Sequence, residues 1–229
     1  MTGSAQRFFD RVYAQAHGPD VLPWHRDAPP ALLTRVVAER ARAGTSGRAL
    51  DIGCGSGVFS VWLAQQGYEV TGLDFSAPAI AMAHKTVERA GVAVNLVRAD
   101  VLEWQNATLF DLIFDSGCLH GFRGAARQRY RDRLLTRLAP GGAYVLGHFD
   151  RRHPLDWRPV GPRRVPPARI RALFVPPLVE RARDAETHRA EFPIGPTVRV
   201  ALYWFEKEPM NTGHGGAERG QISGLTPTG

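Results

Sequence analysis

The hydrophobic pattern of the chain alternates between two kinds of segment. Short apolar runs, which are typical of buried strands, occupy 49–52, 68–74, 93–98, 110–115 and 143–149. Between these runs, apolar residues recur at helical spacing, in the segments that follow Gly57 and Ser76 and in the segment 123–138. Strands that alternate with helices predict an α/β fold with a parallel sheet.

Both ends of the chain depart from this alternating pattern. Helical spacing predicts two helices before the first strand, at 4–16 and 29–43, and we expect about residues 1–43 to form a helical lid. After the fifth strand we expect a short helix and two strands joined as a hairpin, at 168–174, 178–191 and 197–207. Residues 208–229 lack a hydrophobic pattern and are predicted to be disordered, so the domain is expected to cover 1–207.

A glycine-rich turn joins the first strand to the following helix. Its glycines are Gly53, Gly55 and Gly57, and Asp51 lies two residues before the first of them. Glycine permits positive φ and lets a ligand approach the backbone at a helix N-terminus. The spacing is not the dinucleotide pattern Gly-x-Gly-x-x-Gly, and an acidic Asp51 suits an amine better than a pyrophosphate. Taken alone, the turn also fits a structural turn in another α/β protein.

Acidic residues also follow the second and third strands. Asp74 ends the second strand, where a carboxylate can accept both hydroxyls of a ribose, and Phe75 is positioned to lie against a flat ring. Asp100 and Val101 follow the third strand. An isolated Asp74 would equally fit a helix-capping or loop residue. The glycine turn one crossover earlier favours ligand binding.

These features occur in the order that is typical of one family. The glycine turn, Asp74, Asp100-Val101 and a Pro-Gly-Gly turn at 138–142 follow one another along the chain. Over about residues 29–207 the chain resembles the class I S-adenosylmethionine-dependent methyltransferases. The resemblance implies a Rossmann-like seven-stranded sheet, mostly parallel with an antiparallel C-terminal hairpin, and helices on both faces.

The resemblance also implies S-adenosyl-L-methionine as the cofactor. In this family the acid of the first motif serves the methionine end, and an acid after the third strand faces the adenine amino group. The cofactor-binding residues expected here are Trp24, Asp51, Gly53, Gly55, Gly57, Asp74, Phe75, Asp100, Val101 and Asp115. The Pro23-Trp24 loop, the Asp115–His120 stretch and the segment 161–165 most resemble small bacterial members near the thiopurine and tellurite-resistance methyltransferases.

The exit of the fourth strand bears on the methyl acceptor. It reads Asp115-Ser116-Gly117-Cys118 and lacks the Asn/Asp-Pro-Pro-Tyr/Phe motif with which many amino-directed DNA, RNA and protein enzymes hold a planar nitrogen. A small-molecule acceptor, such as a thiol or hydroxyl compound, is therefore expected. Ligands of open α/β sheets bind outside the carboxyl ends of the strands. We thus expect the acceptor between the Trp24 loop, this exit and the basic loop 150–167.

Methyl transfer is an in-line displacement in which positioning supplies much of the rate. A base is needed only for a neutral thiol or hydroxyl. His120 is the first candidate, with an unperturbed pKa near 6.5, and His148 is the second, although a structural role also fits either residue. Cys118 is expected to be a small buried residue, because methyl transfer requires no covalent enzyme intermediate.

The net positive charge of the chain keeps a second hypothesis about its function open. The net charge is +7 and the sequence pI is about 10.1, as in many nucleic-acid-binding proteins. The basic residues are scattered, however, and Lys85 and Lys207 are the only lysines, a composition typical of GC-rich coding sequences. An RNA-directed methyltransferase is the alternative, and a non-enzymatic binding protein is favoured least. Four loop arginines either face an anionic acceptor or are solvated: Arg151, Arg152, Arg163 and Arg164.

The remaining composition bears on the cellular compartment of the protein and on whether it binds a metal. The sequence has no run of eighteen apolar residues and no apolar secretory core near its start. Two cysteines, Cys54 and Cys118, can build neither a disulfide framework nor a four-ligand zinc site. We therefore expect a reduced, cytoplasmic protein without a metal site or a membrane span, and no obligate protein partner is evident.

Overall fold

Seven strands form one sheet within the residues that the computed structural model of the chain describes, which are 3–150, 164–189 and 197–209. The strands are β1 (Arg48–Ile52), β2 (Glu69–Asp74), β3 (Val94–Arg98), β4 (Phe110–Ser116), β5 (Leu138–Asp150), β6 (Leu178–Arg189) and β7 (Thr197–Lys207). The α-helices are α1 (Gly3–Gln15), α2 (Ala31–Arg42), α3 (Val58–Gln65), α4 (Ala77–Ala90), α5 (Gly124–Arg137) and α6 (Pro167–Phe174).

The strand order is β3-β2-β1-β4-β5-β7-β6. The pairs from β3 to β5 are parallel, and β7 lies antiparallel between β5 and β6. This arrangement confirms the predicted Rossmann-like sheet with its antiparallel C-terminal hairpin. The order reverses between β1 and β4, so the exits of these strands border the crevice that such sheets use for ligands.

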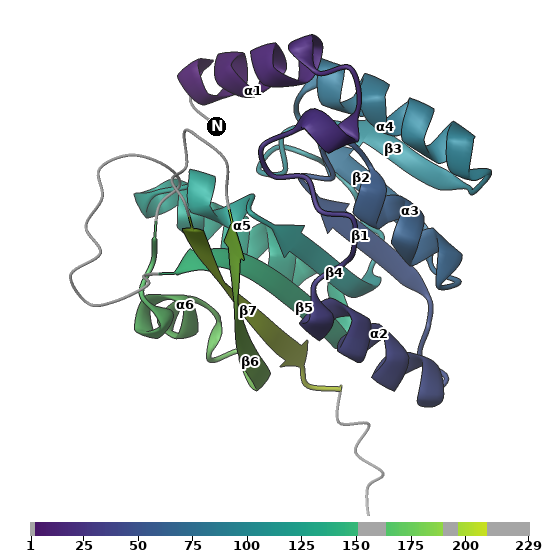
Figure 1. Cartoon of the computed structure of the whole chain (residues 1–229). Coiled ribbons are helices and arrows are strands. Elements are labelled where there is room, and N and C mark those ends of the chain that lie inside the picture. The colour runs from purple at the N-terminus through teal and green to yellow at the C-terminus, as the bar shows by residue number, and fades with distance from the viewer. Residues whose placement is uncertain (1–2, 151–163, 190–196, 210–229) are drawn as a thin grey trace, which may run out of the picture.

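Helices cover both faces of the sheet, as predicted (Figure 1). On one face, apolar residues of α2 and α3 pack against β1, β4 and β5. On the other face, α5 and α6 pack against the same central strands, where Tyr130 and Phe174 are fully buried. The central strands read as nearly continuous apolar runs because both faces of the sheet are covered.

Local sequence explains why α4 begins and ends where it does. Ser76 is the N-cap residue, and its hydroxyl accepts a hydrogen bond from the backbone N–H of Ala79. Pro78 lies in the first turn, where its missing N–H costs nothing. Gly91 ends the helix in the left-handed conformation, at a φ of 64°. The start of this helix is thereby fixed directly after Asp74.

The Pro-Gly-Gly segment differs from its prediction as a tight turn before a strand at 143–149. It belongs to β5, which begins at Leu138. Phe110 of β4 pairs with Leu138, whereas Leu112 pairs with Ala143, so the extra residues of β5 form an irregularity in the ladder. Gly141 lies there at a φ of 71°, a conformation that glycine adopts readily.

The N-terminal segment splits into two parts. α1 packs on α4, and the loop from Pro19 to Trp24 continues over the same region (Figure 1). In contrast, α2 belongs to the helical layer on the sheet, where Leu32, Leu33 and Val36 are fully buried. The part of the chain that covers the exits of β1 and β2 is therefore the part before α2.

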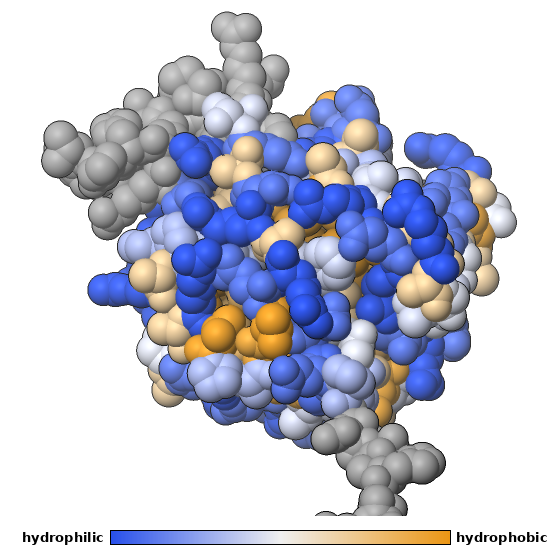
Figure 2. All heavy atoms as spheres, turned by 90° about the horizontal axis from the view of Figure 1, so that it is seen from below, coloured by the Kyte–Doolittle hydropathy of each residue, from blue (hydrophilic) through white to orange (hydrophobic). Residues whose placement is uncertain are grey.

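Several expectations lie outside the described residues. They concern Arg151, Arg152, Arg163 and nearly all of the tail 208–229. In the described part of the chain, no helix is both long and apolar enough to cross a membrane. Figure 2 shows one face of the molecule, which is mostly hydrophilic with small groups of apolar residues.

Candidate active site

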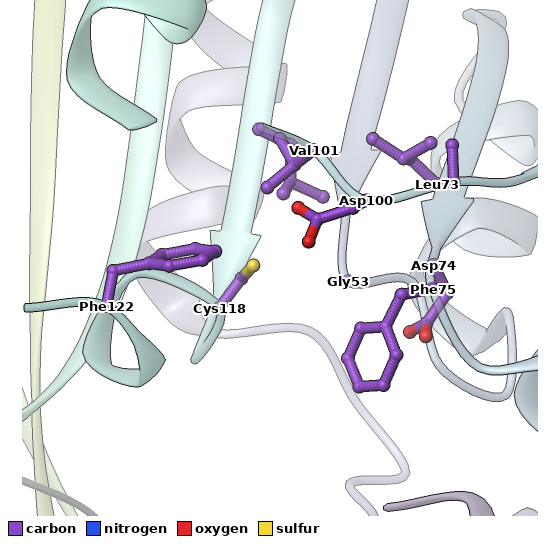
Figure 3. A pocket seen from close by; sticks show the side chains of 10 residues that line it. Gly53, Leu73, Asp74, Phe75, Asp100, Val101, Cys118 and Phe122 are labelled. Carbon is purple, nitrogen blue, oxygen red and sulfur yellow. The ribbon is translucent and has the colours of Figure 1, made fainter. Parts of the chain in front are cut away.

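A cavity opens at the carboxyl ends of β1, β2 and β3, beside the exit of β4 (Figure 3). Five residues predicted to bind the cofactor line it: Gly53, Asp74, Phe75, Asp100 and Val101. The other residues on its wall are Ile52, Leu73, Ala99, Cys118 and Phe122. Parallel strands bring these segments together because their carboxyl ends meet at one edge of the sheet.

The glycine turn is fixed against the end of β2. The backbone N–H groups of Gly53 and Cys54 both donate to the carbonyl of Leu73, at 2.7 and 3.0 Å. Gly53, Gly55 and Gly57 all have positive φ, between 54° and 79°. A Cβ on Gly55 would collide with the hydroxyl of Tyr13 in α1. The turn therefore needs glycine both for its conformation and for close packing.

Asp74 is held by the backbone around it. Its carboxylate accepts hydrogen bonds from the N–H groups of Gly55, at 3.0 Å, and Ser76, at 2.9 Å. The side chain is only 7% exposed, and burial raises the pKa of its carboxyl. These bonds tie the glycine turn to the start of α4, and each carboxylate oxygen keeps a further lone pair for a ligand.

Asp51 lies beneath the glycine turn and is not among the residues on the cavity wall. It is almost fully buried and accepts a hydrogen bond from the hydroxyl of Ser60 at 2.7 Å. Burial raises the pKa of its carboxyl to about 7, and the charges of Asp74 and Asp115 act in the same direction. A bound cation near Asp51 would favour the ionised form.

Asp100, Val101 and Phe75 surround the middle of the cavity. Figure 3 shows the carboxylate of Asp100 pointing into the space that Phe75 and Cys118 border. One oxygen of Asp100 accepts a hydrogen bond from the N–H of Leu102 at 2.9 Å. Val101 is buried on the same wall. A half-exposed carboxylate beside apolar surface suits a flat ring that carries an amino group.

An aromatic cluster lies over the glycine turn. The indole N–H of Trp24 donates to the hydroxyl of Tyr13 at 3.1 Å. The ring of Phe9 packs edge-to-face on Trp24 and on Phe75, at centroid distances of 5.4 and 6.0 Å. Trp24 thus belongs to the covering segment and does not line the described cavity.

A hydrogen bond fastens this covering segment to α4. The hydroxyl of Ser76 donates to the carboxylate of Asp10 at 2.6 Å, while it also accepts from the N-terminus of α4. Ser76 therefore joins α1 to the start of α4, directly after the cavity residue Phe75. The position of α1 and the geometry at Asp74 involve the same residue, because the Ser76 hydroxyl binds Asp10 and the Ser76 backbone N–H binds Asp74.

Asp115 was expected among the cofactor-binding residues; it does not line the described cavity itself but binds the backbone of Cys118, which does. It is fully buried and accepts hydrogen bonds from the N–H groups of Cys118 and Leu119, at 2.6 and 3.0 Å. The hydroxyl of Tyr130 donates to it at 2.5 Å. Burial raises its pKa to about 6. Here Asp115 fixes the exit loop of β4, including the short 3₁₀ turn Leu119–Gly121.

His120 and His148 lie side by side at the exits of β4 and β5. Their ring centroids are 5.9 Å apart, and His120 also packs on Phe149 at 4.9 Å. The Nδ1 of His148 lies 3.0 Å from the carbonyl of Phe149. Because a carbonyl only accepts, Nδ1 carries the proton and Nε2 keeps a lone pair. That Nε2 is buried and has no partner among the described residues.

Burial changes the basicity of both imidazoles. It lowers the pKa of His120 to about 3, with a smaller effect from His148, and it lowers the pKa of His148 to about 4. The sequence interpretation assumed an unperturbed pKa near 6.5 for His120, and that assumption was wrong because it ignored burial. Both rings are neutral near pH 7 and can accept hydrogen bonds.

Cys118 lies on the cavity wall as a free thiol beside the glycine turn. Figure 3 shows its sulfur turned towards the cavity, and a Cβ on Gly53 would stand 3.3 Å from the Cβ of Cys118. Burial raises the pKa of this thiol well above its usual value. A thiol that stays protonated is a poor nucleophile, as a residue without a covalent role would be. Cys118 was expected to be buried, but it is only half-buried because it borders the cavity.

Sequence reasoning gave no site role to two aromatic residues that the structure brings to this region. Tyr13 reaches the glycine turn from α1, and Phe122 reaches the cavity from the loop before α5. Neither has a local signal, because the apolar spacing around Tyr13 also fits ordinary core packing. Only the three-dimensional arrangement identifies them.

The described residues fit S-adenosylmethionine. A cofactor with an amine, a ribose and an adenine ring needs an acid near the glycine turn, an acid at the end of β2 and a polar group beside apolar surface. Asp51, Asp74 and Asp100 meet these needs in that order, and no described cation pairs with Asp51 or Asp74. The lack of a Cβ on Gly53 leaves bare backbone on the cavity wall.

Comparisons with known proteins agree with this arrangement. Residues 49–142 match the family model of a methyltransferase domain. The 2-heptyl-1-hydroxyquinolin-4(1H)-one methyltransferase of Mycobacteroides abscessus is 28% identical over 66% of this chain and 67% of its own length. The probable thiol methyltransferase 2 of Arabidopsis thaliana is 33% identical over 61% of this chain and 60% of its own length.

A solved structure extends the likeness to nearly the whole fold. The N-methyltransferase NodS from Bradyrhizobium japonicum, in complex with S-adenosyl-L-homocysteine, superposes with a TM-score of 0.65. It covers 88% of this chain and 97% of its own, at 22% identity, which shows a shared fold. The family model, the relatives and the cavity agree. These findings support a class I S-adenosylmethionine-dependent methyltransferase with S-adenosylmethionine as its cofactor.

Proposed function

We propose that the protein transfers a methyl group from S-adenosylmethionine to the sulfur or oxygen of a small thiol or hydroxyl compound. The observation that carries this proposal is the Nε2 of His148, a residue that is only 2% exposed and lies beside His120; this atom has no hydrogen-bond partner among the described residues. An acceptor atom has to leave bulk water to reach it. A small molecule can do so, whereas a base in an RNA duplex would first have to leave its stack.

The cofactor residues of this proposal are arranged around the cavity. Asp74 holds the ribose, Asp100 and Val101 hold the adenine ring, and Asp51 favours the charged amine from beneath the turn. When bound, S-adenosylmethionine supplies an electrophilic methyl group on a positively charged sulfur. Trp24 and Tyr13 cover the glycine turn and keep water away from that end of the site.

The acceptor loses its proton to His148. The carbonyl of Phe149 keeps the proton of His148 on Nδ1, so the lone pair of Nε2 accepts a hydrogen bond from the acceptor's S–H or O–H. The acceptor atom would gain positive charge as it takes up the methyl group and S-adenosylhomocysteine leaves with the electron pair of the broken carbon–sulfur bond, and its proton would then become strongly acidic. Even an imidazole with a pKa of about 4 can then take that proton. His120 packs against His148 and keeps the proton acceptor in place.

The relatives support this acceptor class. One is named for a hydroxyquinolinone and another for thiols, so both named activities concern small molecules. The net charge of +7 is the observation that favours RNA as a second candidate. Scattered charge of this kind binds polyanions weakly and without sequence preference, and that binding falls steeply with salt.

The experiment is a test of S-adenosylhomocysteine release on the full chain, with panels of small thiols, phenols, amines and bulk RNA at matched acceptor concentration. We expect turnover with members of the thiol or phenol panels. The His148→Gln variant should lose that turnover while it still binds S-adenosylhomocysteine. Methyl incorporation into RNA at physiological salt, with no turnover of any small molecule, would replace this proposal with the RNA-directed one.

A further inference from the structure

One buried hydroxyl at the glycine turn donates its proton to no described residue. Tyr13 of α1 is only 7% exposed, and its hydroxyl oxygen accepts a hydrogen bond from the indole N–H of Trp24 at 3.1 Å. Among the described residues, none accepts the proton of this hydroxyl in return. A buried donor without an acceptor is costly, because it has given up its hydrogen bonds to water. The proton of the Tyr13 hydroxyl is therefore available to a ligand.

The hydroxyl of Tyr13 lies directly against the glycine turn. A Cβ on Gly55 would collide with it, so only the bare backbone of glycine allows this contact. The N–H of the same glycine donates to the carboxylate of Asp74 at 3.0 Å, and Asp74 lines the cavity. Tyr13 thus reaches from α1 the same residue of the turn that Asp74 reaches from β2.

The turn itself has already used most of its backbone donors. The N–H groups of Gly53 and Cys54 both donate to one carbonyl of β2. The N–H of Gly55 donates to Asp74, and the N–H of Gly57 donates to the carbonyl of Cys54 at 2.9 Å. Each backbone N–H supplies a single donor. An anion that binds at these residues therefore needs a donor from another element.

The methionine end of S-adenosylmethionine carries such an anion. Its ammonium and its carboxylate are attached to the same carbon atom, so both groups lie at one place in the site. Asp51, beneath the turn, suits the ammonium because their charges are opposite. The carboxylate needs a proton donor instead. Burial raises the pKa of Tyr13, and the charge of Asp74 raises it further, so the hydroxyl keeps its proton near neutral pH.

We propose that the hydroxyl of Tyr13 binds the carboxylate at the methionine end of the cofactor, and that Trp24 is a positioning residue for that hydroxyl. The indole N–H occupies one lone pair of the phenol oxygen, so the proton points away from Trp24. Two hydrogen bonds in a chain also strengthen one another. The inference rests on the part of the proposed function that places the methionine end at the glycine turn, and it is independent of the methyl acceptor.

The first test uses two ligands that differ only in the carboxylate. S-adenosylhomocysteine and its decarboxylated analogue, 5′-(3-aminopropylthio)-5′-deoxyadenosine, share the adenosine, the sulfur and the amine. Calorimetry gives both dissociation constants, and their ratio measures the preference for the carboxylate. We expect the wild type to prefer S-adenosylhomocysteine and Tyr13→Phe to reduce that preference about ten- to hundredfold, as for one lost hydrogen bond to a charged group. Trp24→Phe should reduce it by a smaller factor, because the hydroxyl of Tyr13 remains.

Two further hydroxyl variants are the matched controls. Tyr68→Phe removes the hydroxyl of an equally buried tyrosine that directly precedes β2, at the opposite end of that strand from Asp74. Ser56→Ala removes the hydroxyl of the turn itself, from a half-buried side chain. Both should keep the wild-type preference. A loss in Ser56→Ala with none in Tyr13→Phe would assign the carboxylate to Ser56 and overturn the inference.

The same measurements separate this inference from the cofactor site as a whole. Equal weakening of both ligands in Tyr13→Phe would mean that the hydroxyl only supports the fold, and it would overturn the inference. A wild-type protein without preference for the carboxylate would do the same. Both results leave the cofactor site in place, because S-adenosylhomocysteine still binds. A wild-type protein that binds neither ligand would instead contradict the cofactor site itself, and this inference with it.

The second test follows the helix that carries Tyr13. At saturation, S-adenosylhomocysteine should slow amide hydrogen exchange in α1 more than the decarboxylated analogue does, because only the former ligand joins α1 to the turn. Tyr13→Phe should remove this difference between the ligands, whereas Tyr68→Phe should keep it. Equal protection of α1 by both ligands in the wild type would contradict a bond between Tyr13 and the carboxylate.

Discussion

The two ends of the site are built in different ways. At the cofactor end, Asp74 and the glycine turn bind one another through the backbone within about twenty residues of chain. At the proposed acceptor end, His120 and His148 come from the exit of β4 and from β5, and one ring nitrogen of each is buried without a partner among the described residues. The proposed cofactor end is acidic and locally encoded, whereas the proposed acceptor end is built around two neutral imidazoles from different elements.

This difference teaches which parts of the site can vary independently. The bonds at the cofactor end fix the backbone itself, so a change there disturbs the strand exits and the start of α4 together. The groups at the acceptor end project from a framework that Asp115 and Tyr130 hold in place. We therefore expect substitutions at the acceptor end to alter turnover and selectivity while cofactor binding persists.

The largest effect is expected for Asp74→Ala. The change removes the proposed ribose partner and leaves the N–H groups of Gly55 and Ser76 without their acceptor. Loss of charge-assisted bonds at a buried site should weaken S-adenosylhomocysteine binding by about a hundredfold or more. Calorimetry measures this, with Asp132→Ala on the exposed side of α5 as the control. Unchanged affinity in a folded Asp74→Ala protein would remove Asp74 from the cofactor site.

A second prediction concerns stability at acid pH. The folded pKa of His148 is lowered from 6.5 to about 4, so the unfolded chain takes up a proton first. The stability linked to His148 is therefore present above pH 6.5 and is lost as the pH falls from 6.5 to 4. In His148→Gln the acid-side slope should be smaller by up to about 1.4 kcal/mol per pH unit.

Urea unfolding of both proteins between pH 4 and 7 measures that difference in slope. The buried carboxyls of Asp51 and Asp115 have raised pKa values, so their contribution falls in the opposite direction, as the pH rises. They are present in both proteins and cancel in the comparison. His84→Gln, at an exposed position of α4, is the control and should match the wild type. Parallel curves for His148→Gln and the wild type would show that His148 is not buried in its neutral form.

The smallest effect is expected for Trp24→Phe. The change keeps an aromatic ring beside Phe9 but removes the hydrogen bond from the indole to Tyr13. Loss of one neutral hydrogen bond should reduce kcat about two- to tenfold by loosening the covering segment. Steady-state kinetics at saturating cofactor measures it. A wild-type kcat in both Trp24→Phe and Trp24→Ala would mean that the covering segment plays no part in turnover.

The same contrast explains what the sequence could predict. The sheet, its hairpin and the cofactor acids have local signals: apolar runs, a glycine turn and acids directly after strands. The assumed basicity of His120 failed because burial depends on Phe149 and His148, which lie almost thirty residues away. The surroundings of Asp115 likewise depend on another element, because the hydroxyl of Tyr130 in α5 donates to its carboxylate.

The most direct test of this division measures two quantities on one variant, His148→Gln: kcat with a neutral thiol at saturating cofactor, and the Kd of S-adenosylhomocysteine. We expect kcat to fall about a hundredfold or more, as is typical when a general base is removed, and Kd to stay at the wild-type value. A Kd that weakens in step with kcat, or a kcat equal to that of the wild type, would contradict the assignment of His148 to an independent acceptor end.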